Sequence, residues 1–326
     1  MQPNKQLRFI LIISLVAICI IAGIILFKSL DILERLYTRG VEKAEVVILT
    51  SDVITDQSWG SLAYKGKLKI EEQYPTNVTL HSELKTSKLK EEMISKVVAG
   101  KPDVIIGHGR EFSAFFAKVA TKFPHINFVT IHGNAIHSNQ SVYTFDQDRV
   151  EYIAGIIAGM KTTSNKVGLI DAFEAREKNT GFEKGLMKNN PHSTLDYRVV
   201  NSRNDGEKAL QIVKEMIESG VDVVFTKGNG YNKDVVNYAK EKGIYVIGYL
   251  EDQSYMGRDI VLTSVQNDVS QAYVVLMKDY FSEEGLSSGK KMLDQSDGVY
   301  ELAPLGPMFT EEEKQILQPE IKKLSK

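Results

Sequence analysis

From Ala44 onward, the chain alternates short apolar runs with amphipathic stretches, and this alternation constrains the fold more than any other feature. Runs such as residues 46–49 and 104–106 lack polar positions, which is typical of strands covered by helices on both faces. The predicted strands are residues 45–50, 77–81, 103–107, 127–131, 166–171, 196–200, 222–226, 244–248 and 259–264. Strands that alternate with helices predict an α/β fold of mostly parallel, doubly wound sheets.

The alternating region is too long for one such sheet, and we expect two lobes, each with its own core. The first lobe is placed at residues 44–145 and completed by about 249–281, and the second at 146–248 and completed by about 282–326. Residues 282–298 are polar and rich in turn formers, which predicts an exposed connection. A hinge is expected where the chain crosses between lobes, near residues 145, 248 and 282.

Residues 9–27 form a run without a charge, which as a helix would extend about 28 Å, close to the apolar thickness of a bilayer. The run predicts a single-pass transmembrane helix or signal anchor, with residues 1–28 as the membrane anchor and 29–44 as a stalk. Cys19 is the single cysteine, but Ile18 precedes it and the apolar run continues beyond it, which favours a membrane-buried residue over a lipid-attachment site. The basic residues on the two sides slightly favour a cytoplasmic body, whereas the resemblance described below favours a body outside the cytoplasm, and we follow the resemblance.

Composition narrows the class of function. The chain carries 40 basic and 42 acidic residues, which argues against a domain that must neutralise nucleic-acid phosphates. The six histidines show no metal-binding spacing, and no nucleophile elbow or phosphate-binding loop motif is present. We therefore expect no catalytic residue, metal or cofactor, and no enzyme activity.

In open α/β sheets, ligands bind where the carboxyl ends of the strands meet loops and helix N-termini. The candidate ligand-binding residues in such places are Asp56, Trp59, Ser61, Gly107, His108, Phe173, Asn229, Tyr231, Tyr249 and Asp252. Trp59 either stacks on a flat ligand or packs against a neighbouring loop. Asp56 either binds the ligand or caps the helix that begins near Ser58, and Asp252 either caps a helix or helps to hold the loop at the crevice. His108 lies between two glycines and either faces a ligand or occupies a tight turn with its ring in solvent.

Several segments together resemble the basic-membrane-protein family of periplasmic-binding-like proteins, whose nucleoside-binding members work with ABC importers. The resemblance rests on residues 56–66 (DQSWGSLAYKG), 105–112 (IIGHGREF), 123–131, 145–170 and 220–273. It implies a periplasmic-binding-protein type 1 fold with two lobes. Within the family, the sequence resembles the Med branch, whose members are positive regulators of bacterial competence.

The resemblance also assigns residues. Asp56 and Trp59 match the acidic residue and the base-stacking aromatic of the nucleoside binders. Gly60 replaces an asparagine, Leu250 replaces the ribose-binding aspartate, and Gln266 replaces a lysine. Gln266 therefore joins the candidate residues, and a grip on ribose is expected to be weakened, because charge-assisted hydrogen bonds are lost.

Two functions follow as hypotheses. In the first, a membrane-anchored binding protein closes its lobes over a small, nucleoside-like ligand, for an ABC permease or for sensing, with the bulk of the chain outside the cytoplasm. In the second, the chain is a regulator that acts through protein partners. Regulators of the LacI type share this fold but carry a DNA-reading domain of about 60 residues. Residues 1–44 leave no room for one, so we expect no nucleic-acid partner.

Overall fold

The computed structural model describes residues 23, 28, 43–55, 59–174 and 180–324. Within them, Glu45–Lys326 belong to one compact unit that contains two six-stranded sheets. The expected membrane helix at 9–27 and most of the expected stalk at 29–44 lie outside the described residues. In the described part of the chain, no helix combines the length and apolar character needed to cross a membrane.

The first sheet has the strand order β11-β5-β4-β3-β1-β2. Its strands are β1 (Ala44–Leu49), β2 (Thr76–His81), β3 (Val104–Gly107), β4 (Asn127–Ile131), β5 (Gln140–Phe145) and β11 (Gly289–Leu293). Pairing is parallel from β1 through β3, β4 and β5 to β11. We call this sheet and the helices that cover it the first lobe.

The second sheet has the order β12-β10-β9-β8-β6-β7, and we call it, with its helices, the second lobe. Its strands are β6 (Lys166–Asp171), β7 (Thr194–Val199), β8 (Val223–Lys227), β9 (Tyr245–Leu250), β10 (Val261–Asn267) and β12 (Tyr300–Leu302). Pairing is parallel except between β10 and β12. The two sheets thus correspond strand by strand, with β3 in the place of β8 and β1 in the place of β6.

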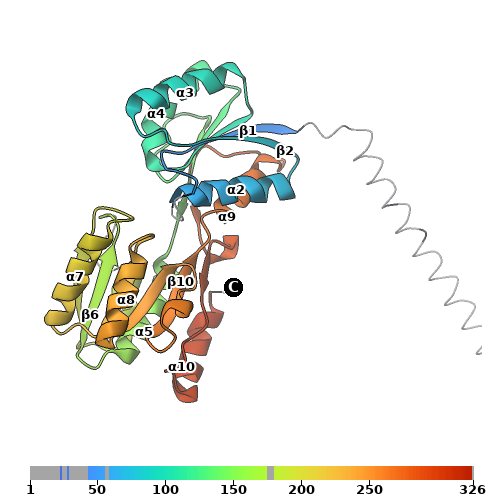
Figure 1. The fold of residues 1–326 in the computed structure, drawn as a ribbon. Coiled ribbons are helices and arrows are strands. Elements are labelled where there is room, and N and C mark those ends of the chain that lie inside the picture. The colour runs from blue at the N-terminus through green and yellow to red at the C-terminus, as the bar shows by residue number, and fades with distance from the viewer. Residues whose placement is uncertain (1–22, 24–27, 29–42, 56–58, 175–179, 325–326) are drawn as a thin grey trace, which may run out of the picture. The chain divides into compact units, whose positions relative to one another are not determined.

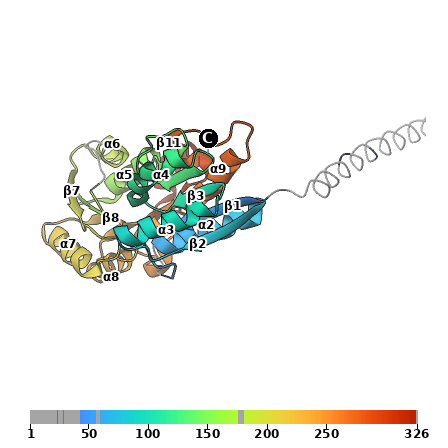
Figure 2. The same cartoon turned by 90° about the horizontal axis from the view of Figure 1, so that it is seen from above.

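Helices cover both faces of each sheet. In the first lobe, α2 (Trp59–Gln73) and α9 (Gln271–Tyr280) lie side by side on one face, with α3 (Ser87–Ala99) and α4 (Ser113–Val119) on the other (Figure 1). In the second lobe, Figure 2 shows α5 and α6 on the opposite side of the sheet from α7 and α8. These helices are α5 (Asp148–Lys161), α6 (Gly181–Asn189), α7 (Gly206–Glu218) and α8 (Asn232–Lys242), and α10 (Glu311–Lys322) contacts α5.

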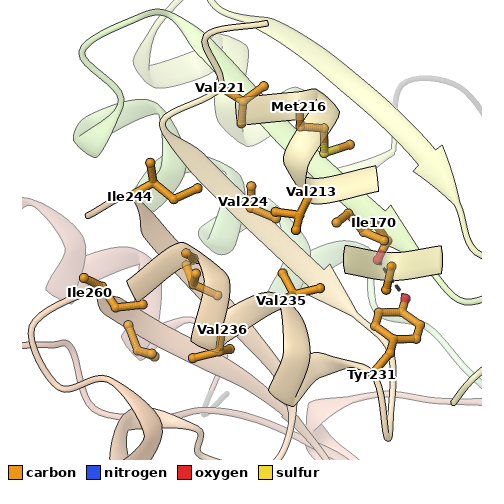
Figure 3. Close-up of a cluster of buried hydrophobic side chains, with 14 of the residues drawn as sticks. Ile170, Val213, Met216, Val221, Val224, Tyr231, Val235, Val236, Ile244 and Ile260 are labelled. Carbon is orange, nitrogen blue, oxygen red and sulfur yellow. Dashed lines mark hydrogen bonds between the residues drawn. The ribbon is translucent and has the colours of Figure 1, made fainter. Parts of the chain in front are cut away.

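The core of the second lobe shows why these residues form these elements. Val213 and Met216 of α7 and Val235 of α8 point onto Val224 of β8, and all four are fully buried (Figure 3). The apolar stripe at helical spacing in residues 209–217 is therefore the face of α7 that packs on the sheet. Burial of each such side chain contributes about 1.5–3 kcal/mol to folding.

The expected α/β architecture with two mostly parallel sheets is confirmed, and β4 and β6 have the predicted bounds. The chain is divided between the sheets differently from the expectation. Strand β10, which lies in the stretch expected to complete the first lobe, belongs to the second sheet, and β11, within 282–298, belongs to the first. Strand β11 escaped prediction because it is a half-exposed edge strand with two lysines rather than an apolar run.

The chain crosses between the sheets three times, after β5, after β10 and after β11. The first crossing lies at the expected residue 145. The hinge positions expected near 248 and 282 fall inside single lobes, because β9 and β10 pair in one sheet and α9 leads to β11 of its own lobe. The three crossings bring Gln147, Asn267 and Tyr300 to one place between the sheets.

Candidate functional site

A cavity of about 160 Å³ lies where the crossings meet, and we call it the central cavity. The first lobe contributes aromatic and basic side chains to its wall, and the second lobe contributes a mixture of aromatic, amide and charged ones. The lining residues include Trp59, Arg110, His132, Phe145, Gln147, Asp171, Phe173, Arg203, Lys227, Asn229, Tyr249, Leu250, Asn267 and Tyr300. The carboxyl ends of β4, β6, β8 and β9 all reach this cavity, as expected for parallel sheets.

Two larger cavities adjoin the central one. The α2-side cavity, of about 570 Å³, shares Asn229, Tyr249 and Leu250 with it. The β4-side cavity, of about 530 Å³, shares Arg110 and His132 with it. Pockets for drug-sized ligands usually measure about 300–1,000 Å³, so a ligand larger than a few atoms would extend from the central cavity into a neighbour.

Trp59 begins α2 and lines the central cavity with only 7% of its surface exposed. Its indole nitrogen donates a hydrogen bond to the carbonyl oxygen of His108 at 3.1 Å. Its ring stacks on the His108 ring, with 4.4 Å between the centroids. Trp59 therefore packs against its neighbouring loop and also reaches the cavity, so the two roles considered for it from the sequence are compatible.

His108 packs against the Trp59 ring and is fully buried. One ring nitrogen is hydrogen-bonded to the Trp59 carbonyl oxygen at 2.8 Å and the other to the Tyr273 hydroxyl at 2.7 Å. Burial lowers the pKa of His108 to about 3, so the ring is neutral at physiological pH. With both nitrogens engaged, His108 positions Trp59 and is neither a solvated turn residue nor a group that faces the cavity.

Arg203 joins the two lobes across the central cavity. Its guanidinium carbon lies 4.7 Å from the centre of the Trp59 ring and 5.0 Å from that of Phe173. Cation–π contacts at such distances contribute about 0.5–1 kcal/mol each when exposed and more when desolvated. The guanidinium lies on the aromatic surface on which a flat ligand would stack, so such a ligand competes with Arg203 for Trp59.

Lys227 ends β8 and forms a buried ionic network with Glu151 of α5 and Asp171 of β6. The lysine and Glu151 side chains are only 6% and 2% exposed. The two carboxylates hold the pKa of Lys227 above its usual value despite burial. This network holds the Lys227 side chain in place in the second lobe, and the two carboxylates balance its positive charge.

Three buried polar atoms around the central cavity have no hydrogen-bond partner among the described residues: Gln147 Oε1, Asn229 Nδ2 and Asn267 Oδ1. Buried polar groups in proteins are nearly always hydrogen-bonded, and leaving one unpaired costs about 1–3 kcal/mol. All three come from the crossings or from the loop after β8. They therefore form a set of two acceptors and one donor that a polar ligand can satisfy.

The backbone is strained at two lining residues. His132 and Leu250, which are not glycines, have φ angles of 63° and 79°. Such conformations cost about 1–3 kcal/mol and cluster at functional sites. Leu250, at which the resemblance predicts the loss of a ribose-binding aspartate, lines the central cavity.

The other predicted residues are spread around this site. Ser61 and Gln266 line the α2-side cavity together with Asn229 and Tyr249. Phe173 lines the central cavity and is 43% exposed. Gly107 packs so closely that a Cβ atom would lie 2.5 Å from Phe112, so its role is backbone packing.

Tyr231 does not reach the cavity but lies in the hydrophobic core, fully buried, with its hydroxyl donating to the carbonyl oxygen of Ile170 (Figure 3). Asp252 accepts a hydrogen bond from the backbone N–H of Ser254, the first residue of a short helix whose N-cap is Gln253. Asp56 lies outside the described residues.

Sequence reasoning missed several lining residues, among them Arg110, His132, Arg203 and Lys227. Lys227 ends β8, His132 directly follows β4 and Arg110 lies three residues after the end of β3, so the rule that ligands bind at strand ends would have found them. The crossing residues Gln147, Asn267 and Tyr300 give no local signal, because only the tertiary fold brings them together. Among the described residues, no group of three potential metal ligands is present.

Comparisons with known proteins place this architecture in a family. The chain is 29% identical over 282 residues to the transcriptional activator protein med of Bacillus subtilis, covering 86% of this chain and 89% of that protein. It is 22% identical over 262 residues to basic membrane protein A2 of Borrelia garinii, covering 77% and 76% of the two chains.

Among solved structures, a transcriptional activator of the comK gene from Bacillus halodurans matches with a TM-score of 0.76 and 28% identity, over 86% of this chain and 97% of that one. An ABC transporter solute-binding protein from Conexibacter woesei matches with a TM-score of 0.64 and 18% identity, over 86% and 96% of the two chains, which shows a shared fold. The model of the Bmp family, described as ABC transporter substrate-binding protein PnrA-like, matches residues 43–326. The chain is therefore a member of the Bmp family.

Proposed function

We propose that this chain binds a small polar solute between its two lobes and acts as a substrate-binding protein for an ABC permease or as a sensor. The observation that carries the proposal is the set of unpartnered buried atoms of Gln147, Asn229 and Asn267 around one cavity. Membership of a substrate-binding family supports the same role. The proposal includes no catalytic residue, metal or cofactor.

The ligand we propose has polar groups that pair with the three amides and a part that contacts Trp59. A nucleoside-like compound fits this description in outline. Leu250 cannot accept the ribose hydrogen bonds that an aspartate in its place would accept, and hydrogen bonds to a charged group contribute about 1.5–3 kcal/mol each. We therefore propose a ligand that differs from a plain nucleoside.

We further propose that residues 9–27 hold the protein in the cell membrane as a single span, with both lobes outside the cytoplasm. The uncharged run in the sequence supports the anchor. Family membership supports the location of the lobes, because an importer's binding protein meets its solute outside the cell. Protease treatment of intact protoplasts tests this: the lobes should be cleaved, and a fully protected body would contradict the proposal.

Binding can be measured through Trp59, because it is the single tryptophan of the chain. Nucleosides, nucleotides and sugars are titrated into the full-length protein in detergent while tryptophan emission is recorded. A ligand found in this way should bind at least about fivefold more weakly to Asn229→Ala, since removal of a buried donor costs about 1–3 kcal/mol. Asn237→Ala, at an exposed position of α8, is the matched control. Equal affinity in both variants would contradict the role of the central cavity.

A second candidate function is regulation of transcription through protein partners. The similarity to the med protein and to the comK activator favours it. It is compatible with ligand binding if the lobes transmit the bound state to a partner. We propose no direct DNA contact, and salt-dependent binding of the full chain to duplex DNA would contradict this.

A further inference from the structure

The β4-side cavity extends the ligand site into the first lobe. It shares Arg110 and His132 with the central cavity, so the two cavities meet at these side chains. Its lining also includes Lys290 of the edge strand β11, Thr144 of β5 and Ser113 at the start of α4. A solute that enters between the lobes can therefore reach this cavity.

The charge of this cavity is one-sided. Arg110 and Lys290 are its charged lining residues, and none of the described residues that line it is acidic. Neither Arg110 nor Lys290 forms a salt bridge with a residue that the structure describes. The neighbouring acid Glu111 is hydrogen-bonded to the hydroxyl of Ser51 instead. The positive charge therefore remains available to a bound group.

The pKa of His132, which lines the same cavity, is also affected by these positive charges. Burial, with the repulsion of Arg110, Arg203 and Lys290, lowers the pKa of His132 to about 4. Arg110 and Lys290 belong to the first lobe, and Arg203 belongs to the second. His132 is neutral at physiological pH and adds no charge of its own, while its Nδ1 is hydrogen-bonded to Thr144 Oγ1 at 2.7 Å. Its Nε2 has no hydrogen bond to a described residue.

From this arrangement we propose that the ligand carries a negative group, a phosphate or a carboxylate, and that Arg110 and Lys290 bind it in the β4-side cavity. The inference rests on the proposed solute-binding function and makes it narrower. Hydrogen bonds between guanidinium or ammonium groups and an anion are the strongest polar contacts available to such a site. The polar head of the ligand then lies next to His132, and its remaining part occupies the central cavity beside Trp59. Because Arg110 lines both cavities, it is the residue that connects the two parts of the ligand.

The test uses the full-length chain in detergent, with inorganic phosphate as the probe. Thermal unfolding is followed while sodium chloride is replaced by sodium phosphate at constant ionic strength. Bound phosphate should raise the melting temperature, because a ligand that binds the folded state stabilises it. The rise should be lost in the double variant Arg110→Gln/Lys290→Gln. Phosphate also stabilises proteins without binding, and Lys122→Gln, at an exposed lysine of the same lobe, controls for this contribution.

A second measurement compares ligands. Tryptophan emission is titrated with a nucleoside, its 5′-monophosphate and a matched carboxylate, and we expect the anionic compounds to bind about tenfold more tightly or better. Which of the two anions binds more tightly identifies the negative group.

The same phosphate response in the double variant and in Lys122→Gln would overturn the inference. If neutral nucleosides bind as tightly as their anionic derivatives and Asn229→Ala weakens both, the solute-binding function stands and the inference fails. If phosphate binding depends on Arg110 and Lys290 but Asn229→Ala affects no ligand, the anion site stands and the wider function fails.

Discussion

Each lobe has a cation near the carboxyl end of one central strand, but the two cations have different surroundings. Lys227 ends β8 in the second lobe, and Arg110 follows β3, the corresponding strand of the first. Glu151 and Asp171 neutralise Lys227 in a buried network, whereas Arg110 has no salt bridge with any described residue. The same strand end thus serves stability in one lobe and is open to a ligand in the other. The charge of a side chain therefore does not identify it as a binding residue, whereas the presence or absence of a partner for that charge does.

Replacement of Lys227 should have the largest effect. Lys227→Met leaves Glu151 and Asp171 as buried carboxylates without a counter-charge, and we expect the free energy of unfolding to fall by about 3–5 kcal/mol. Urea denaturation of the full-length protein measures it. Lys188→Met, at an exposed position of the same lobe, is the matched control. The second substitution in Lys227→Met/Glu151→Gln should restore part of the stability, and a double variant less stable than Lys227→Met would contradict the network.

The first lobe has its own buried polar group, His108, and pH should reveal it. The unfolded histidine has its ordinary pKa of 6.5 and the folded one a pKa of about 3, so the unfolded chain binds more protons between these values. The contribution of neutral His108 to the free energy of unfolding is therefore fully present above pH 6.5. Between pH 6.5 and about 3 it falls by about 1.4 kcal/mol for each unit by which the pH decreases.

His108→Gln should reduce this slope between pH 4.5 and 6.5, a range above the usual pKa of carboxylates. His132, with a folded pKa of about 4, contributes in the same direction, so His132→Gln is measured beside it. An unchanged slope in His108→Gln would show that the ring is not buried in its neutral form.

The smallest effect is expected at Arg110 and Lys290. Because neither residue has a salt bridge with a described residue, Arg110→Gln/Lys290→Gln should change the free energy of unfolding by about 0.5 kcal/mol or less. The same urea titration measures it. A loss comparable to that of Lys227→Met would remove the contrast between the lobes and show that the first-lobe cations are structural.

The sequence predicted the parts of the fold that depend on local pattern. Apolar runs such as those in β3 and β8 carry their own signal, and so does the stripe of α7. Strand β11 does not, because Lys290 and Lys291 are acceptable at an edge that faces solvent. The same limit applies to the site. Trp59 and Asn229 lie in segments that follow strands and could be predicted, whereas Gln147 and Asn267 reach the cavity only because the chain crosses between the sheets there.

The resemblance also predicts departures from the family pattern, among them Leu250 in the place of an aspartate, and these stay predictions. That Leu250 lines the cavity in a left-handed backbone conformation depends on the fold. The contact of Arg203 with Trp59 joins side chains of separate lobes, and no local pattern predicts it.

The hydrogen bond between His108 and Tyr273 joins residues that are 165 positions apart. While the ribosome makes the chain, β1 to β5 emerge early, but α9 and β11, which complete their lobe, follow only after nearly all of the second lobe. Until α9 is made, the Nδ1 atom of His108 therefore lacks its partner, the hydroxyl of Tyr273. N-terminal domains usually fold first during synthesis. In this protein the second lobe, whose core elements α5 to β10 are contiguous, is positioned to fold before the lobe that precedes it.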